Sequence, residues 1–363
     1  MTARRRWLWG LLIGLAALLN VGFGPALRTS DTAGSALYPE QARLLAETWA
    51  GPGISAPAAV IYDVDAGQFL LERNAHQRRP PASLTKIATA LVALRRLNLS
   101  QTVTVGDEVQ VEGMRIGLVP GDTLTVEALL YGTLLNSGND AAAALAVAAA
   151  GSQERFVEEM NALAAELGLQ DTHFVNPHGL DSAGHYSSAY DLALLANAAL
   201  ANPTFAAIVA APAKELDGWQ FHTTNQLLGA YPGVDGVKTG TTDDAGECLV
   251  ASATRHGHRV LTVVLGSTDR YADTRALLDF YYGHYQWVRL ELPAGRLSAE
   301  TDLQGHLWRY ALPTAVEVLL ARWESPWLGM TWQGDGQGSW QAVRFWVGSR
   351  LITEQPVQVY QVY

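Results

Sequence analysis

The chain has 363 residues, of which 48% are hydrophobic and 17% are charged, and its formal net charge is −10. This length exceeds one typical hydrophobic core, so we expect two domains, and the composition excludes extensive disorder. The negative charge works against binding to nucleic acid or anionic lipid, because both are negatively charged themselves. The single cysteine, Cys248, excludes an internal disulfide, and the apolar residues after it predict a buried strand.

Residues 1–28 are typical of an export signal. Three arginines at positions 4–6 precede an apolar run over residues 7–27, which as a helix reaches roughly 30 Å and spans a bilayer. No Ala-x-Ala cleavage site follows closely, so a cleaved signal and a retained membrane anchor both stay open. In either case we expect the rest of the chain to be extracytoplasmic, after a polar linker over residues 29–39.

Two hairpins are predicted near the ends of the region from residue 40 to residue 285. Each consists of two apolar or extended runs joined by a short turn that contains glycine. The first joins 59–64 to 68–72 through Asp65-Ala66-Gly67, and the second joins 246–254 to 259–265 through Arg255-His256-Gly257-His258.

The segment between the hairpins is predicted to be mostly helical. Pro80-Pro81 fixes the start of a helix over residues 83–97, because proline is tolerated at the beginning of a helix and not in its interior. The other helices are predicted over residues 126–134, 140–150, 153–167, 189–201 and, beyond the second hairpin, 273–282. Strands at both ends with helices between them predict one α/β (mixed) domain whose sheet joins distant segments.

Residues 286–363 are predicted to form a small all-β domain. Seven of the eleven tryptophans lie there and no lysine does. Short strand-like runs, such as 342–347 and 357–363, alternate with glycine and proline turns.

Three short motifs carry the chemistry, and each pattern occurs once in the sequence. They are Ser83-Leu84-Thr85-Lys86, Ser137-Gly138-Asn139 and Lys238-Thr239-Gly240. Serine is a weak nucleophile unless a neighbouring base takes its proton, and Lys86 follows Ser83 by three residues on the same face of a helix. The first turn of that helix has unpaired N–H groups, which favour a developing oxyanion.

The use of lysine supports this interpretation. The 25 basic residues include only three lysines, at positions 86, 214 and 238, so lysine at two motif positions fits chemistry better than surface charge. Lys86 acts as a base only if burial, the helix N-terminus and a second cation, Lys238, lower its pKa far below the usual value of about 10.4, and arginine cannot replace it. Gly240 lets a substrate backbone approach, and Thr239 offers a hydroxyl to a carboxylate or carbonyl. The Ser137 turn is alternatively a plain helix N-cap.

These motifs resemble the active-site signature of the low-molecular-mass penicillin-binding proteins, the serine D-alanyl-D-alanine carboxypeptidases. The resemblance runs from about Ala58 to Tyr285, and the later β region resembles more loosely the second domain that many members carry. Further family-like segments are Val119-Pro120-Gly121-Asp122, Phe156-Val157-Glu158-Glu159-Met160-Asn161, His173-Phe174, His178-Gly179-Leu180-Asp181, Tyr186-Ser187-Ser188 and Asp235-Gly236-Val237. The resemblance implies a penicillin-binding/β-lactamase-like transpeptidase domain with an antiparallel sheet flanked by helices.

The resemblance also implies a covalent acyl-enzyme mechanism on the terminal D-Ala-D-Ala of a peptidoglycan stem peptide. Ser83 attacks the carbonyl between the alanines with Lys86 as base, and Ser137 and Lys238 pass the proton to the departing D-alanine. β-Lactam antibiotics are implied as covalent inhibitors. No metal or cofactor is implied.

The expected substrate-binding residues are Asn139, Thr239, Gly240, Thr241 and Arg270. The N–H groups of Ser83 and Thr241 form the expected oxyanion hole, Asn139 holds the peptide, and Thr239 with Arg270 holds the terminal carboxylate. The sequence departs from the family in two respects. Some members carry a histidine where this chain has Thr241, and the amphipathic C-terminal helix that often anchors members is missing, so we expect membrane attachment through the N-terminal segment.

Three other classes of protein share some of these features. A β-lactamase needs a glutamate to activate water, and Glu158 with Asn161 offers Glu-x-x-Asn, although on what is predicted to be a solvent-facing helix. A zinc carboxypeptidase needs a ligand cluster, but His173, His178 and His185 lack a His-Glu-x-x-His pattern and are predicted to shape a loop beside the serine. A catalytically weak cell-wall-binding homologue stays open.

Overall fold

The computed structural model describes residues 39–291, 299–301, 307–312, 316–334 and 340–362. The predicted signal or anchor of residues 1–28 and residues 29–38 of the predicted linker lie outside this described part. The described residues form two compact units, one comprising Gly51–Tyr281 and the other comprising Pro39–Ala50 with the residues from Tyr282 onward. The domain limits given by the sequence stay a prediction.

The first unit is built around a five-stranded antiparallel sheet in the order β2-β1-β9-β8-β7. Its strands are β1 (Ala58–Asp63), β2 (Gln68–Arg73), β7 (Val234–Thr242), β8 (Gly246–Arg255) and β9 (His258–Ser267). The predicted hairpins are confirmed as β1–β2 and β8–β9. Ala58 in β1 lies opposite Leu265 in β9, so the sheet joins the two ends of the unit. The predicted mixed α/β fold with an antiparallel sheet is therefore confirmed.

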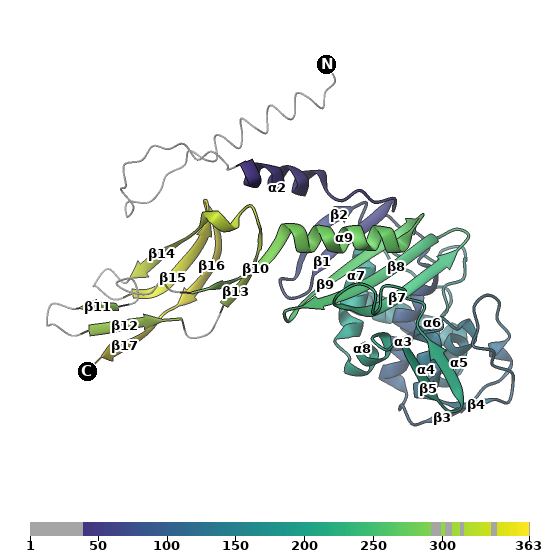
Figure 1. The fold of residues 1–363 in the computed structure, drawn as a ribbon. Coiled ribbons are helices and arrows are strands. Elements are labelled where there is room, and N and C mark those ends of the chain that lie inside the picture. Colours follow the sequence, from purple (N-terminus) through teal and green to yellow (C-terminus); the bar gives the residue numbers. More distant parts are fainter. Residues whose placement is uncertain (1–38, 292–298, 302–306, 313–315, 335–339, 363) are drawn as a thin grey trace, which may run out of the picture. The chain divides into compact units, whose positions relative to one another are not determined.

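Both faces of this sheet are buried. Along β1, Ala58, Val60 and Tyr62 belong to the main hydrophobic core, while Ala59 and Ile61 point to the opposite face and are also fully buried. Helix α9 (Arg270–His284) lies along one face, and the other helices of the unit gather on the opposite one (Figure 1). This double cover explains why the central strands have unbroken apolar runs rather than alternating ones.

The helices predicted for this unit are confirmed, with ends shifted by at most three residues. They are α3 (Lys86–Arg96), α4 (Val126–Leu134), α5 (Asn139–Ala150), α6 (Gln153–Glu166), α7 (Ala189–Leu200) and α9, and the structure adds the short α8 (Pro203–Val209). Helices α4, α6 and α7 each begin at a capping side chain. Thr125, Ser152 and Ser188 accept a hydrogen bond from the backbone N–H three residues further along the chain. Helix α8 was not predicted, although Asn202 caps it and Pro203 opens it.

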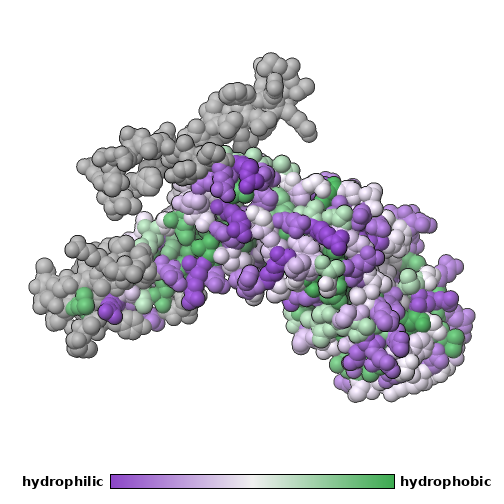
Figure 2. Space-filling view, in the orientation of Figure 1, coloured by the Kyte–Doolittle hydropathy of each residue, from purple (hydrophilic) through white to green (hydrophobic). Residues whose placement is uncertain are grey.

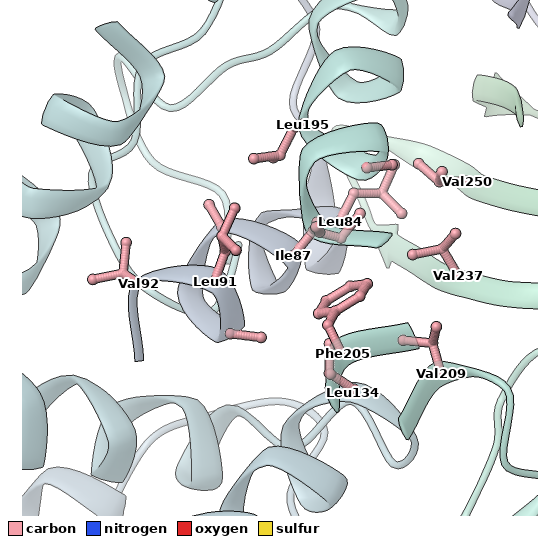
Figure 3. Close-up of a cluster of buried hydrophobic side chains, with 14 of the residues drawn as sticks. Leu84, Ile87, Leu91, Val92, Leu134, Leu195, Phe205, Val209, Val237 and Val250 are labelled. Carbon is pink, nitrogen blue, oxygen red and sulfur yellow. The ribbon is translucent and has the colours of Figure 1, made fainter. Parts of the chain in front are cut away.

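Helix α3 presents its apolar face to the centre of the core. Figure 3 shows Leu84, Ile87 and Leu91 within a cluster of buried apolar side chains from several elements. The other labelled members are Val92, Leu134, Leu195, Phe205, Val209, Val237 and Val250. Because Leu84 and Ile87 directly follow Ser83 and Lys86 in the chain, burial of the apolar side chains fixes the direction in which the two motif residues point.

Two small hairpins were not predicted. Strand β3 (Thr102–Thr104) pairs with β4 (Thr123–Thr125), and β5 (Ala213–Leu216) pairs with β6 (Trp219–His222). These strands are too short to give a clear alternating pattern. The second hairpin reaches the Ser137 turn, because Asn136 Oδ1 accepts a hydrogen bond from the N–H of His222 at 3.1 Å.

The second unit contains helix α2 (Pro39–Ala50), which the sequence did not predict, and small antiparallel sheets. Its described strands are β10 (Tyr285–Leu290), β11 (Ala299–Thr301), β12 (Leu307–Ala311), β13 (Val316–Ala321), β14 (Leu328–Gly334), β15 (Trp340–Val347), β16 (Arg350–Pro356) and β17 (Gln358–Val362). They pair in the orders β10-β13, β11-β12-β17 and β14-β15-β16. Leu290, Val343 and Phe345 form the centre of a small core. The β-rich character predicted for the C-terminal region is confirmed in its described residues.

The face of the first unit that is visible in Figure 2 is mainly polar. Figure 2 shows hydrophilic or neutral side chains over most of its visible face, with small scattered hydrophobic patches. Met114 and Val119 are the large apolar side chains of this unit that are more than half exposed. Among the described residues, no single helix is long and apolar enough to cross a membrane.

Asp273 fixes helix α9 to the sheet. Its carboxylate accepts hydrogen bonds from the N–H groups of Ser55 and Ala56 and from the hydroxyls of Ser55 and Ser267. Burial alone would raise the pKa of Asp273, but the hydrogen bonds from Ser267 and Ser55 together lower it. The helix is therefore held at the beginning of β1 and at the end of β9.

Replacing Asp273 by alanine is expected to lower the free energy of unfolding by about 3 kcal/mol, because buried donors lose their acceptor. The folded-state pKa of Asp273 lies below its unfolded value. Its contribution is therefore present at neutral pH and is lost as the pH falls below about 4. Urea denaturation at several pH values measures both effects, with the exposed change Asp279→Asn on the same helix as control. Equal stability of the two variants would contradict the anchoring role.

Candidate active site

Ser83 lies in a tight turn before helix α3. Residues Ala82–Thr85 form a 3₁₀ turn, and the α-helix begins at Lys86, so the predicted α-helical start at residue 83 is wrong. In a 3₁₀ turn the side chains at i and i+3 lie directly above each other, which places Ser83 and Lys86 on one face. Their contact is direct, with 2.8 Å between Lys86 Nζ and Ser83 Oγ.

Two segments press against this turn. Ala82 has a φ of +49°, in the left-handed region. A Cβ at Gly179 would lie 1.9 Å from the carbonyl oxygen of Ala82, and a Cβ at Gly240 would lie 3.1 Å from the backbone nitrogen of Ser83. Glycine at both positions therefore lets loop 176–180 and strand β7 closely approach the turn that carries Ser83.

The amine of Lys86 is fully buried and makes three hydrogen bonds. Its Nζ lies 2.8 Å from Ser83 Oγ, 2.7 Å from Asn139 Oδ1 and 2.6 Å from the carbonyl oxygen of His178. The Asn139 amide is oriented by its Nδ2, which donates to the carbonyl of Glu112. Because Asn139 Oδ1 and the His178 carbonyl can only accept, they engage two N–H bonds of Lys86. The remaining position on Nζ, which is a lone pair in the neutral amine, is directed at the hydroxyl of Ser83.

Both motif lysines have lowered proton affinity. Burial lowers the pKa of Lys86 well below its usual value and the cation of Lys238 lowers it further, while the carboxylate of Asp140 raises it. Lys238 is also buried, and its Nζ donates to the carbonyl of Thr239 at 2.9 Å. Burial, followed by the charge of Arg270, lowers the pKa of Lys238 to about 7. An arginine at either position would not release its proton.

The Ser137 turn opens helix α5. Ser137 has a left-handed φ of +62°, and the N-cap is Gly138 without a side-chain cap, so the alternative of a plain serine N-cap is wrong. Asn139 begins the helix and delivers its amide to Lys86. The carboxylate of Asp140 accepts hydrogen bonds from the N–H groups of residues 116–118, which orders the neighbouring loop.

Arg270 holds strand β7 in place. Its Nη1 donates to the carbonyls of Gly240 at 2.8 Å and Cys248 at 3.2 Å, and its Nη2 donates to Thr241 Oγ1 at 2.5 Å. The side chain is buried, with Nε 3.3 Å from Glu247 Oε2. These donors are directed at β7 and β8. The role expected for Arg270 in binding a substrate carboxylate stays a prediction.

Ser137 and Thr239 lie outside the direct contacts of Lys86. Within the described residues, no hydrogen bond joins Ser137 to either motif lysine. Thr239 is buried, and its Oγ1 lies 2.6 Å from Oγ1 of Thr224. No sequence pattern predicts a role for Thr224, because its run Thr-Thr-Asn is not a recognisable motif.

Loop 176–180 supplies a contact that the three motifs did not predict. Asn176 Oδ1 accepts hydrogen bonds from the N–H groups of His178 at 3.3 Å and Gly179 at 2.7 Å, and this turn directs the His178 carbonyl at Lys86. The His178 ring is buried, and burial followed by the charge of Lys86 lowers its pKa to about 3. The ring is therefore neutral at physiological pH. The only sequence signal for this contact was the family-like His178-Gly179-Leu180-Asp181 segment.

His185 ties the same loop to the start of helix α3. Its Nδ1 accepts a hydrogen bond from the N–H of Val175, so its Nε2 carries the hydrogen that is donated to Thr85 Oγ1 at 2.8 Å. Burial, followed by the charge of His173, lowers the pKa of His185 to about 4. These bonds fit the prediction that the histidines shape a loop. Among the described residues, no three metal-ligating side chains cluster as a metal site would require.

The Glu-x-x-Asn pair considered for a β-lactamase, Glu158 and Asn161, lies on helix α6 away from Ser83's hydrogen-bond partners. Glu158 is exposed on α6. Asn161 donates to the carbonyls of Val157 and Phe174 and accepts a hydrogen bond from the N–H of Phe174. Within the described residues, neither side chain has a hydrogen bond to Ser83 or Lys86.

Known proteins share this sequence and fold. The family model described as D-alanyl-D-alanine carboxypeptidase matches residues 46–269. The D-alanyl-D-alanine carboxypeptidase DacF of Bacillus subtilis is 39% identical over 64% of this chain and 63% of its own length, and DacD of Salmonella typhimurium is 37% identical over 74% of each chain. Penicillin binding protein 6B from Escherichia coli has a TM-score of 0.70 at 33% identity, covering 84% of this chain and 95% of its own. The Streptomyces K15 DD-transpeptidase has a TM-score of 0.61 at 34% identity, covering 64% and 99%.

Replacing Gly179 by alanine is expected to displace the turn of Ser83, because the new Cβ would overlap the carbonyl of Ala82. Gly184→Ala is the matched control. Gly184 has nearly the same φ, +83° against +88°, and its Cβ would meet nothing closer than 3.9 Å. Both variants bear a backbone strain of about 1 kcal/mol from alanine at a positive φ. Only Gly179→Ala also bears the clash, so its free energy of unfolding should fall by at least about 2 kcal/mol more than that of Gly184→Ala. Urea denaturation of both variants measures the difference, and equal losses would contradict the close approach.

Proposed function

Because the chain belongs to the D-alanyl-D-alanine carboxypeptidase family, we propose that it removes the terminal D-alanine from peptidoglycan stem pentapeptides through an acyl-enzyme on Ser83. The observation that carries this proposal is the amine of Lys86. It is buried, two of its hydrogen bonds go to pure acceptors, and the third position faces Ser83 Oγ. That arrangement suits a base for a serine hydroxyl.

In the proposed first step, Ser83 Oγ forms a bond to the carbonyl carbon between the two D-alanines while its proton passes to Lys86 Nζ. The C–N bond then breaks, and the departing amine takes a proton from the hydroxyl of Ser137, which Lys238 replenishes. Water then attacks the ester carbonyl: its hydroxyl group stays on the released peptide and its other proton returns to Ser83 Oγ. The proton that Lys86 took up offsets the one that Lys238 gave, so their exchange restores the starting state. A pKa of about 7 suits Lys238 to this relay, because the amine both holds and gives up a proton near neutral pH.

The remaining site residues are proposed to hold the substrate. The N–H groups of Ser83 and Thr241 stabilise the oxyanion, and Asn139 binds the peptide in addition to orienting Lys86. Gly240 lets β7 lie close to the turn that carries Ser83, and its backbone is proposed to lie beside that of the substrate. Thr239 donates to the terminal carboxylate, and Arg270 contributes its positive charge behind β7.

We place this activity outside the cytoplasm, since stem peptides of peptidoglycan lie there. The basic and apolar residues 1–28 support export, with attachment to the membrane where the segment is retained. The alternative of a catalytically weak cell-wall-binding homologue is separated by one measurement, the release of free D-alanine from a pentapeptide.

β-Lactams present a strained amide and are expected to acylate Ser83. Intact-mass analysis after incubation with penicillin should show one adduct on the wild-type chain and none on Ser83→Ala. Free D-alanine released from a pentapeptide should fall by at least about 10³-fold in the same variant, because nucleophilic catalysis is lost. An adduct that persists in Ser83→Ala would overturn the nucleophile assignment.

Lys86→Arg keeps a positive charge but removes the base, so penicillin acylation should slow by at least about 10²-fold. Lys238→Arg should be milder, because arginine keeps the cation and the donor near the departing amine and loses only the proton that Lys238 supplies to Ser137. In the wild-type chain the rate should fall at low pH, where Lys86 becomes protonated. It should also fall above about pH 7, where Lys238 loses its proton. Second-order rates from about pH 5 to pH 10 decide the matter. A larger loss for Lys238→Arg would assign the base to the other lysine.

A further inference from the structure

All three polar groups of Thr224 join separate parts of the site. Its N–H donates to the carbonyl of Leu135 at 3.2 Å, just before the Ser137 turn. Its Oγ1 lies 2.6 Å from Oγ1 of Thr239 in β7. Its carbonyl accepts a hydrogen bond at 2.8 Å from the hydroxyl of Tyr271, which follows Arg270 in helix α9. One residue therefore contacts the segments that carry the second and third motifs and the helix that braces β7.

The residues beside Thr224 fix its position. His222 donates its N–H to Asn136 Oδ1 at 3.1 Å, and Thr223 donates its N–H to the carbonyl of Pro212 at 3.0 Å. Asn225 Nδ2 donates to the carbonyl of Gly236 at 3.0 Å. Because the backbone is held on both sides, the Thr224 side chain has a defined place from which to reach Thr239.

The direction of the hydrogen bond between the two hydroxyls matters for a bound anion. A hydroxyl donates one hydrogen. If Thr239 donated to Thr224, its lone pairs would face a substrate carboxylate and repel it. If Thr224 donates instead, the hydrogen of Thr239 is free for the carboxylate, and the two bonds polarise each other.

We propose that Thr224 is a positioning residue that donates to Thr239 and thereby directs the Thr239 hydroxyl at the terminal carboxylate of the substrate. The inference rests on the proposed function, because it requires a substrate that ends in a free carboxylate. Thr224 acts through Thr239 and does not touch the reacting atoms.

The test compares one acylated peptide ending in D-Ala-D-Ala with the same peptide ending in D-Ala-D-alaninamide. Thr224→Val keeps the volume of the side chain and removes the donor. It should lower kcat/KM about tenfold for the peptide with the free carboxylate and less than about twofold for the carboxamide. The reason is that the hydrogen bond from Thr239 to the charged carboxylate is stronger than one to a neutral amide, so more is lost when it weakens. Thr224→Ser restores the hydroxyl and should restore most of the activity.

Thr223→Val is the matched control. Its hydroxyl accepts a hydrogen bond from the N–H of Asn225 and does not contact Thr239, so both substrates should change by less than about twofold. In a Thr239→Val background, Thr224→Val should add little to the loss, because the two hydroxyls act as one unit. Unfolding by urea checks that every variant is folded.

The outcomes separate the two proposals. A wild-type chain that releases D-alanine, with a Thr224→Val variant that loses equally on both substrates or not at all, overturns the role of Thr224 alone. A folded wild-type chain that is inert toward both peptides and toward penicillin overturns the proposed function and this inference with it. Additive losses in the double variant also contradict the positioning role.

Discussion

The site depends on keeping one lysine amine away from water while giving it two acceptors in fixed positions. An ammonium without partners is costly to bury, and a solvated one holds its proton too firmly to act as a base. Asn139 Oδ1 and the His178 carbonyl resolve this conflict, because they satisfy the buried N–H bonds in either charge state. One acceptor comes from α5 and the other from loop 176–180, while burial, followed by the charge of Lys238, lowers the pKa of Lys86.

The site uses arginine and lysine for different tasks, because only lysine can lose its proton when it is buried. The chain has 22 arginines and three lysines, and its buried arginine at the site, Arg270, braces β7 and lowers the pKa of Lys238. A guanidinium suits that task, since it donates several hydrogen bonds and keeps its charge. In the proposed mechanism, the amines of Lys86 and Lys238 are the groups that take up and release protons. Arginine therefore supplies the permanent positive charge, and lysine supplies the amines that gain and lose protons.

The sequence predicted what depends on local pattern and missed what depends on tertiary contact. Apolar runs joined by glycine turns predicted the two main hairpins, and motif spacing predicted the pairing of Ser83 with Lys86. The longer helices were also predicted. The tighter 3₁₀ turn at Ser83 is packed against Gly179 and Gly240, which are distant in the chain. Thr224 acts through Thr239, and nothing in its neighbouring residues signals that contact. The hydrogen bonds of Asn176 are local, but their effect on the site depends on the distant contact between the His178 carbonyl and Lys86. The short α8 and β5–β6 hairpin give too little periodicity to detect.

The pairing of β1 with β9 has a consequence for the order of folding. Strand β7, which carries Lys238, is an edge strand that pairs with β8, β8 pairs with β9, and β9 pairs with β1 near the beginning of the unit. Contacts between such distant segments require closure of a long loop and form slowly. A growing chain thus contains Ser83 and Lys86 long before it can close the sheet around them. Under the proposed mechanism, Lys238 joins Ser83 and Lys86 only after β9 has been synthesised, so activity is expected only from a nearly complete domain.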